Sequence, residues 1–267
     1  MHKKRLLVGM CSWSAPKLLK ACVDSLVESL DMDKDGIAVV LNEADEESVK
    51  YLHNLKIPFV AVAENRGELA IDYLKPFVEN SDYFINSNDD MIYHAGFADD
   101  LISIIEENYP CSASCVLVEN FNSNNPSVYV DEELTDFYDL DIQNKYKKNA
   151  IEGKYKRSHK TSGYMHPICV TSKDYLQSGG YSGNWDMDFF SGYGRDDMFA
   201  ATLYSLHKGN FRFITSKDSS VYHASSATNI RKPQKLREQS NQEAFTKRCC
   251  MTIQQFKGVV KVGSLIE

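Results

Sequence analysis

Short apolar runs recur along the first third of the chain, and segments with helical periodicity lie between and after them. The runs lie at residues 6–8, 37–41, 58–62 and 83–85, and each has the length of a buried strand. Helical patterns occupy 18–30, 45–55, 67–79 and 98–108, the first of them just after Pro16, which suits an early helical turn. Strands that alternate with helices predict a parallel sheet with helices on both faces, joined by right-handed crossovers.

The rest of the chain is less regular. Residues 120–162 are predicted to be mostly loop, because 120–127 is rich in Asn and Ser and 131–141 is acidic and aromatic without clear periodicity. A second block begins near Tyr164, with predicted strands at 167–171, 211–214 and 220–223, a Gly-rich segment at 178–194 and a helix at 196–206. Residues 230–267 are basic, and part of this segment is expected to form a mobile flap.

Charge is divided unevenly along the 267 residues, whose net charge is −7. Residues 1–144 carry 10 Lys and Arg against 27 Asp and Glu, so the remaining residues are basic. The densest basic run, 145–160, contains Tyr146 and Tyr155. This run fits a solvated loop beside an acidic surface, and the alternative is a surface for a phosphate-bearing substrate or a nucleic acid.

The cysteines and the hydropathy pattern indicate the compartment. Seven cysteines cannot all pair within one chain, and none lies in a Cys-x-x-Cys pair, so reduced and mostly buried thiols are expected. No apolar run approaches the roughly 18–20 residues of a membrane helix, and no cleavable leader follows the basic start. We therefore expect a soluble, cytoplasmic protein with no transmembrane segment.

Polar residues follow each of the four predicted strands of the first block. Ligands of open α/β sheets bind at the carboxyl ends of the strands, although Asn, Asp and Ser also form ordinary turns there. The sequence has no glycine-rich phosphate loop, so a nucleotide diphosphate would need another device, such as a divalent cation held by carboxylates. The residues concerned are Ser12-Trp13-Ser14, Asn42-Glu43, Asn65-Arg66 and Asn88-Asp89-Asp90.

Two later segments carry further candidate residues. Asp196 and Asp197 open a predicted helix behind a glycine-containing loop, where an Asp can also serve as a helix cap. His223 ends a predicted strand, and its imidazole fits either a metal site or a structural role.

The order and spacing of these pieces resemble the GT-A class of nucleotide-sugar glycosyltransferases, especially the inverting family 2. The resemblance covers about residues 4–228. It differs from many relatives at Asn88, where they have Asp, and at Asp196-Asp197, where they often have Glu-Asp. The matching pieces are 6–14, Asn65-Arg66-Gly67, 83–85 with Asn88-Asp89-Asp90, Gly179-Gly180-Tyr181, Asp196-Asp197 and His223.

The resemblance implies a fold, a domain organisation and a reaction. The fold would be α/β GT-A, with a Rossmann-like nucleotide-sugar-binding half at 1–119, a connecting basic segment at 120–162, an acceptor-binding and catalytic part at 163–228 and a basic flap at 229–267. The reaction would be metal-dependent transfer of a sugar, with Mn²⁺ or Mg²⁺, from a nucleotide sugar to a hydroxyl of a glycan or glycoconjugate, with inversion. UDP is the expected nucleotide, and GDP and dTDP stay open.

Site residues follow from the resemblance and from their place beside the predicted loops. Asp197 is the hypothetical general base, and Asp196 would position the acceptor. Asp90 and His223 would bind the metal, Trp185 and Tyr193 would stack on the acceptor, and Arg231 and Lys232 would contact the diphosphate. The expected nucleotide contacts are Ser12, Trp13, Ser14, Asn42, Glu43, Asn65, Arg66, Asn88 and Asp89.

Three alternatives stay open. The basic run and tail are compatible with a nucleic-acid acceptor, such as a hydroxylated base that would be flipped out of a duplex. A metal-dependent phosphodiesterase could use the same Asp residues and His223 around two ions, and would cleave a phosphodiester without any sugar donor. A non-catalytic module would bind nucleotide sugar without turnover.

Overall fold

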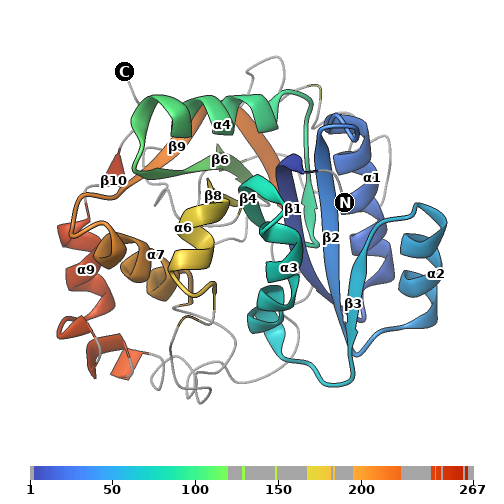
Figure 1. Ribbon diagram of the computed structural model, residues 1–267, viewed down its shortest axis with the longest axis horizontal. Helices are drawn as coiled ribbons and strands as arrows, with labels where there is room; N and C mark the ends of the chain where they lie inside the picture. The colour runs from blue at the N-terminus through green and yellow to red at the C-terminus, as the bar shows by residue number, and fades with distance from the viewer. Residues whose placement is uncertain are drawn as a thin grey trace.

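A computed structural model describes residues 3–119, 128–129, 148, 167–181, 183, 195–223, 242–243, 245–247, 249–260 and 262–263. It has a central sheet with helices on both faces (Figure 1), so the α/β class is confirmed. The first strands and helices are β1 (Lys4–Trp13), α1 (Pro16–Ser29), β2 (Asp35–Asn42), α2 (Glu46–Asn54), β3 (Phe59–Val62), η1 (Gly67–Leu74), α3 (Lys75–Val78), β4 (Ser81–Asn88), β5 (Met91–Ile92) and α4 (Phe97–Asn108). The later ones are β6 (Cys111–Glu119), β7 (Val128–Tyr129), β8 (Ile168–Thr171), α6 (Ser172–Gln177), α7 (Arg195–Leu206), β9 (Arg212–His223), α9 (Ile253–Val259) and β10 (Val262–Gly263).

The strand order is β10-β9-β6-β8-β4-β1-β2-β3. Strands β1 to β4 pair in parallel, as the alternation of strands and helices predicts. Strand β8 runs antiparallel to both of its neighbours, β4 and β6, so the sheet is mainly rather than wholly parallel. Strand β8 joins the first half of the sheet to β6 and β9.

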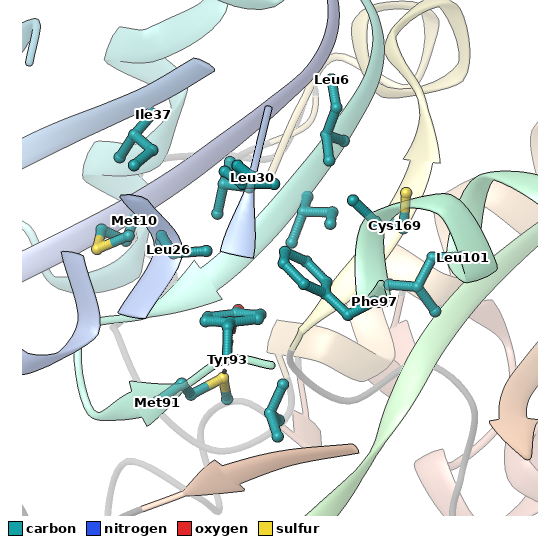
Figure 2. Close-up of a cluster of buried hydrophobic side chains, with 14 of the residues drawn as sticks. Leu6, Met10, Leu26, Leu30, Ile37, Met91, Tyr93, Phe97, Leu101 and Cys169 are labelled. Atoms are coloured by element: carbon teal, nitrogen blue, oxygen red, sulfur yellow. Dashed lines mark hydrogen bonds between the residues drawn. The ribbon is translucent and has the colours of Figure 1, made fainter. Parts of the chain in front are cut away.

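Two hydrophobic cores lie on opposite faces of the sheet because successive side chains of a strand point to opposite sides. Leu6, Val8 and Met10 of β1 pack in one core with side chains of α1 and α4. Figure 2 shows Leu6 and Met10 there with Leu26 and Phe97. Leu7 of β1 belongs to the other core. That core is closed by buried side chains of η1, α3, α6, α7 and α9, which include Leu74, Val78, Tyr175, Phe199 and Phe256.

The second half of the sheet differs from the prediction in two places. Strand β6 was not predicted, because its buried Ser112 and Ser114 interrupt the apolar pattern with small polar side chains. The two strands predicted near 211–214 and 220–223 are one strand, β9. The polar residues at its centre interrupt the apolar pattern, so the sequence indicated two strands. The pairing of β9 with β6 shifts register between Ser114 and Val116, so an irregularity accommodates that centre.

The predicted helix at 67–79 is two shorter helices, the 3₁₀ helix η1 and then α3. Pro76 lies in the first turn of α3. Proline has no N–H group to continue a preceding helix, but it is well suited to a first turn. The break therefore follows from the proline, which the hydrophobic spacing alone did not reveal.

The thiols and the hydropathy agree with part of the prediction. Cys22, Cys111, Cys115 and Cys169 are buried, and none of the seven cysteines, all of which the structure describes, forms a disulfide. Within the described part of the chain, no helix has both the length and the apolar character needed to span a membrane. Most of 120–162, most of the Gly-rich segment and most of the tail lie outside the described residues.

Candidate functional site

Two residues that the sequence predicts as metal ligands, Asp90 and His223, lie together where β5 meets the end of β9. Strand β4 ends at Asn88, and Asp89 and Asp90 form the turn into β5. Met91 pairs directly with His223 in an antiparallel bridge. This pairing brings Asp90 Oδ1 to 3.4 Å from His223 Nε2. Two residues that are far apart in the sequence, and that were predicted as metal ligands, therefore lie side by side.

The two adjacent carboxylates of this turn are buried. Asp89 is 7% exposed and Asp90 is 6% exposed. Burial, and then the charge of Asp90, raise the pKa of Asp89 to about 7, while a hydrogen bond with Ser12 lowers it. Among the residues that the structure describes, none forms a hydrogen bond with Asp89 Oδ2 or Asp90 Oδ1. Buried carboxylate oxygens beside an imidazole fit a divalent cation, which would compensate their charge.

Hydrogen bonds anchor the Asp89-Asp90 turn and connect it to helix α1. The Ser87 and Tyr93 hydroxyls are 2.6 Å apart, and the Tyr93 backbone N–H donates to Ser25 Oγ at 3.0 Å. The Tyr93 ring lies 4.6 Å from that of Phe97, in the core shown in Figure 2. These contacts fix both ends of the turn, so the two Asp residues are held on a rigid support.

The predicted nucleotide contacts gather at the carboxyl ends of β1 and β2. Trp13 pairs in register with Asn42, and its indole N–H donates to Glu43 Oε2 at 2.7 Å. Asn42 Oδ1 accepts from the Arg66 backbone N–H at 3.1 Å, and its Nδ2 donates to the Gly67 carbonyl at 3.2 Å. Asn42 therefore ties the 65–67 turn to the edge of the sheet where Trp13 lies.

Two neighbouring residues of this edge have left-handed backbones. Ser14 has φ of 47° and Glu43 has φ of 51°, values that cost energy for residues other than glycine. Asn65 stabilises its own turn, since Oδ1 accepts from the Gly67 backbone N–H at 2.8 Å. The guanidinium of Arg66 lies 5.9 Å from the centre of the Tyr73 ring.

The predicted catalytic pair lies at the start of α7, as expected. Asp196 Oδ1 accepts a hydrogen bond from the Tyr181 hydroxyl. The side chain of Asp197 is 7% exposed, and its Oδ1 lies 3.3 Å from Lys257 Nζ of α9. The convergence of this pair with Asp90 and His223 stays a prediction.

Sequence reasoning missed Lys257, because an isolated lysine in a basic tail carries no signal for a specific carboxylate partner. Trp185, Tyr193, Arg231 and Lys232 lie outside the described residues. Within the described ranges, no group of three or more His, Cys, Asp and Glu side chains could hold a metal ion. A cation bound by Asp90 and His223 would therefore need ligands from elsewhere, and phosphate oxygens can supply them.

Comparison with known proteins gives matches to solved structures. No family model and no curated sequence matches the chain. Among the solved structures, GalNAc-T7 with UDP, GalNAc and Mn²⁺ matches with a TM-score of 0.57 and 10% identity, over 87% of this chain and 45% of that one. TarS 1–349 of S. aureus, also solved in complex with UDP, matches with a TM-score of 0.59 and 11% identity, over 92% of this chain and 72% of that one.

This chain thus spans less than half of the GalNAc-T7 chain and about three quarters of TarS 1–349. At these identities, the likeness concerns the backbone arrangement. The curled, mainly parallel sheet with helices on both faces is the arrangement that these structures share with it. The chain has the GT-A fold of nucleotide-sugar glycosyltransferases.

Proposed function

We propose that this protein is a metal-dependent glycosyltransferase that moves a sugar from a UDP-sugar to a hydroxyl of a glycan or glycoconjugate, with inversion. The observation that carries the proposal is the pairing of Asp90 with His223 at 3.4 Å, beside the buried Asp89. The proposal is supported by the GT-A fold and by the UDP and Mn²⁺ found with the solved neighbours.

Asp90 and His223 would hold Mn²⁺ or Mg²⁺. When bound, such a cation stabilises the negative charge that develops on the departing nucleoside diphosphate. Asp89 would face the ribose, together with the Trp13, Asn42 and 65–67 cluster. The Trp13 indole would pack against the base, and the Asn42 contacts would keep the 65–67 turn in place for the nucleoside.

A carboxylate at the start of α7 would accept the proton of the acceptor hydroxyl. The hydroxyl oxygen attacks the anomeric carbon as the bond from that carbon to the diphosphate oxygen breaks on the opposite face. Asp197 is the base in the hypothesis drawn from the sequence. The contacts favour Asp196 for this step, because Asp196 is partly exposed, whereas Asp197 is buried against Lys257.

Single substitutions distinguish the two assignments. General-base catalysis contributes about 10²- to 10⁴-fold, so the Asn variant of the base should lose that much in kcat. We expect the larger loss for Asp196→Asn and a smaller one for Asp197→Asn. If both variants keep the rate of the unmodified protein, the pair plays no part in the chemistry.

The experiment for the reaction itself is the release of nucleoside diphosphate from UDP-, GDP- and dTDP-sugars, with Mn²⁺ and with EDTA. We expect Mn²⁺-dependent release of UDP, and a loss of at least about 10²-fold for Asp90→Asn. Asp99→Asn is the matched control, since that side chain is 73% exposed and lies on α4. Release that survives EDTA would contradict the roles of Asp90 and His223.

Three further measurements separate the other candidate activities. Hydrolysis of a phosphodiester without a sugar donor would indicate the phosphodiesterase. Stabilisation by UDP and Mn²⁺ without turnover on any acceptor would indicate a binding module. Transfer to a hydroxymethylated base in duplex DNA would indicate the nucleic-acid acceptor, for which the basic residues 145–160 are the reason.

A further inference from the structure

Asp72 of η1 binds a loop that lies more than a hundred positions later in the chain. Its Oδ1 accepts from the Tyr175 hydroxyl at 2.6 Å and from the Tyr181 backbone N–H at 2.7 Å. Its Oδ2 lies 3.1 Å from Lys75 Nζ, which also donates to the Gly179 carbonyl at 2.6 Å. One carboxylate and one ammonium therefore hold the 179–181 loop from both sides.

The loop is shaped to allow this close approach. Gly180 has φ of 80°, in the region that side chains rarely adopt. A Cβ atom at Gly180 would collide with Asp72 Oδ1 and would lie 2.5 Å from Lys75 Cε. The glycine is thus required by its backbone angle and, independently, by the carboxylate beside it.

Beyond the glycine, Tyr181 connects the loop to the candidate catalytic pair. Its ring is buried and lies 5.3 Å from the ring of Phe199 on α7. Its hydroxyl donates to Asp196 Oδ1 at the start of the same helix. The backbone of Tyr181 is held by Asp72 and its ring by Phe199, so the direction of its hydroxyl is determined at both ends.

Helix η1, which carries Asp72, begins at the expected nucleotide-binding turn. Gly67, the first residue of η1, accepts from Asn42 through its carbonyl. The start of η1 therefore contacts Asn42, an expected nucleotide contact. Near the other end of η1, Asp72 contacts Tyr181, which in turn contacts Asp196. No sequence pattern indicated this, since Asp72 and Lys75 look like an ordinary pair of surface residues three positions apart.

We propose that Asp72 is a positioning residue for the transfer reaction, acting through the Tyr181 backbone to hold the Tyr181 hydroxyl against Asp196. The inference rests on the proposed function, since it gives Asp196 a place in the chemistry. Asp72 does not touch the reacting atoms in this role. Its loss lets the hydroxyl and the carboxylate depart from their mutual geometry while the nucleotide-binding edge stays in place.

The test combines kinetics and hydrogen exchange on three variants of the full chain. Misplacement of a catalytic group by about 1 Å can cost about 10²-fold, so we expect Asp72→Ala to lower kcat for UDP release about 10- to 100-fold with KM for the UDP-sugar within about twofold. Asp72→Asn keeps an acceptor oxygen for Tyr181 N–H and should recover most of kcat. Tyr181→Phe keeps the ring but loses the hydroxyl, so it should lower kcat as Asp72→Ala does.

Amide exchange reports on the loop independently of the reaction. The Tyr181 amide should lose protection in Asp72→Ala and keep it in Asp72→Asn and Tyr181→Phe. Asp45→Ala is the control for a purely structural loss, because Asp45 caps α2 by accepting from the Ser48 backbone N–H at 2.8 Å, away from this loop. It should lower stability without changing kcat.

The outcomes separate the two proposals. Unchanged kcat in Asp72→Ala, or a parallel fall of kcat in Asp45→Ala, would overturn the positioning role. Unchanged protection of the Tyr181 amide in Asp72→Ala would overturn it too, because the carboxylate would then not hold the loop. If the unmodified protein releases no nucleotide from any nucleotide sugar, the proposed function fails, and the positioning role fails with it even where the exchange pattern is as expected.

Discussion

Single residues of this chain carry charge in places that burial makes expensive. The side chain of Asp35 is fully buried, and both its oxygens bind Arg5, at 2.9 and 2.8 Å. Asp99 also binds Arg5, from a side chain that is 73% exposed. The hydrogen bonding that Arg5 donates to Asp35 is the largest cause of the raised pKa of Arg5. The pair ties β1 to the start of β2 and so supports the edge of the sheet opposite the site.

We expect Asp35→Ala to lower the free energy of unfolding by about 3 kcal/mol, because the change leaves Arg5 without its bidentate partner. The cost lies at the lower end of such losses, since Arg5 is one-third exposed and water can solvate it. Asp99→Ala should cost less than about 1 kcal/mol, as exposed pairs do. Urea unfolding of both variants measures the difference, and equal losses would contradict the account.

Among the helices and strands, the hydrophobic pattern predicted the elements whose apolar side chains are regularly buried. Strands β1, β2 and β4 follow from short apolar runs, because they contribute buried side chains to both cores. Helices α1, α2 and α4 follow from an apolar stripe at helical spacing. Strand β6 was not predicted, because a central strand can carry small polar residues such as Ser112 and Ser114 when neighbouring elements bury them. Local pattern contains no information on those neighbours.

The site shows the same division. Asp90 and His223 were predicted from their positions after strands, and the pairing of β5 with β9 brings them together. The partners Tyr181 and Lys257 of the Asp196-Asp197 pair depend on the packing of α6, α7 and α9, which sequence spacing does not define. The role of Asp72 could not be predicted either, because its hydrogen-bond donors Tyr175 and Tyr181 come from the other half of the chain.

Helix α9 gives a prediction at this scale. Thr252 and Gln255 form a capping box at its start, and Lys257 binds the buried Asp197. Lys257→Met keeps most of the side-chain volume but leaves Asp197 with one fewer positive neighbour, so we expect a loss of about 1–3 kcal/mol in the free energy of unfolding.

Lys247→Met is the matched control, since Lys247 is exposed and should contribute less than about 0.5 kcal/mol. Chemical denaturation compares the two. A Lys257→Met protein as stable as the control would mean that α9 is not held by this pair.

For the whole molecule, buried thiols make stability depend on pH. Burial raises the pKa of Cys111 to about 12, and it also raises those of Cys22, Cys115 and Cys169. In the unfolded chain these thiols ionise at their ordinary pKa, about 8.5, so unfolding releases protons above that pH. Their contribution to stability is complete below that value and is lost as the pH rises toward 12.

We expect the free energy of unfolding to fall between pH 9 and pH 11 by up to about 1.4 kcal/mol per pH unit for each buried thiol. Urea unfolding under a reducing agent at several pH values checks this slope. In the native state, a thiol reagent at neutral pH should react with the exposed Cys250 first. A stability that stays constant up to pH 11 would contradict the burial of these cysteines.

The fold brings Asp90, in the turn before β5, next to His223 at the end of β9. The proposed metal site depends on this contact. Calorimetric titration with UDP in Mn²⁺ and in EDTA tests it most directly. We predict that Mn²⁺ strengthens UDP binding, and that Asp90→Asn and His223→Gln each reduce this gain by at least about tenfold, or 1.4 kcal/mol. Binding of UDP that is equal in Mn²⁺ and EDTA, or a gain that both variants keep, would contradict it.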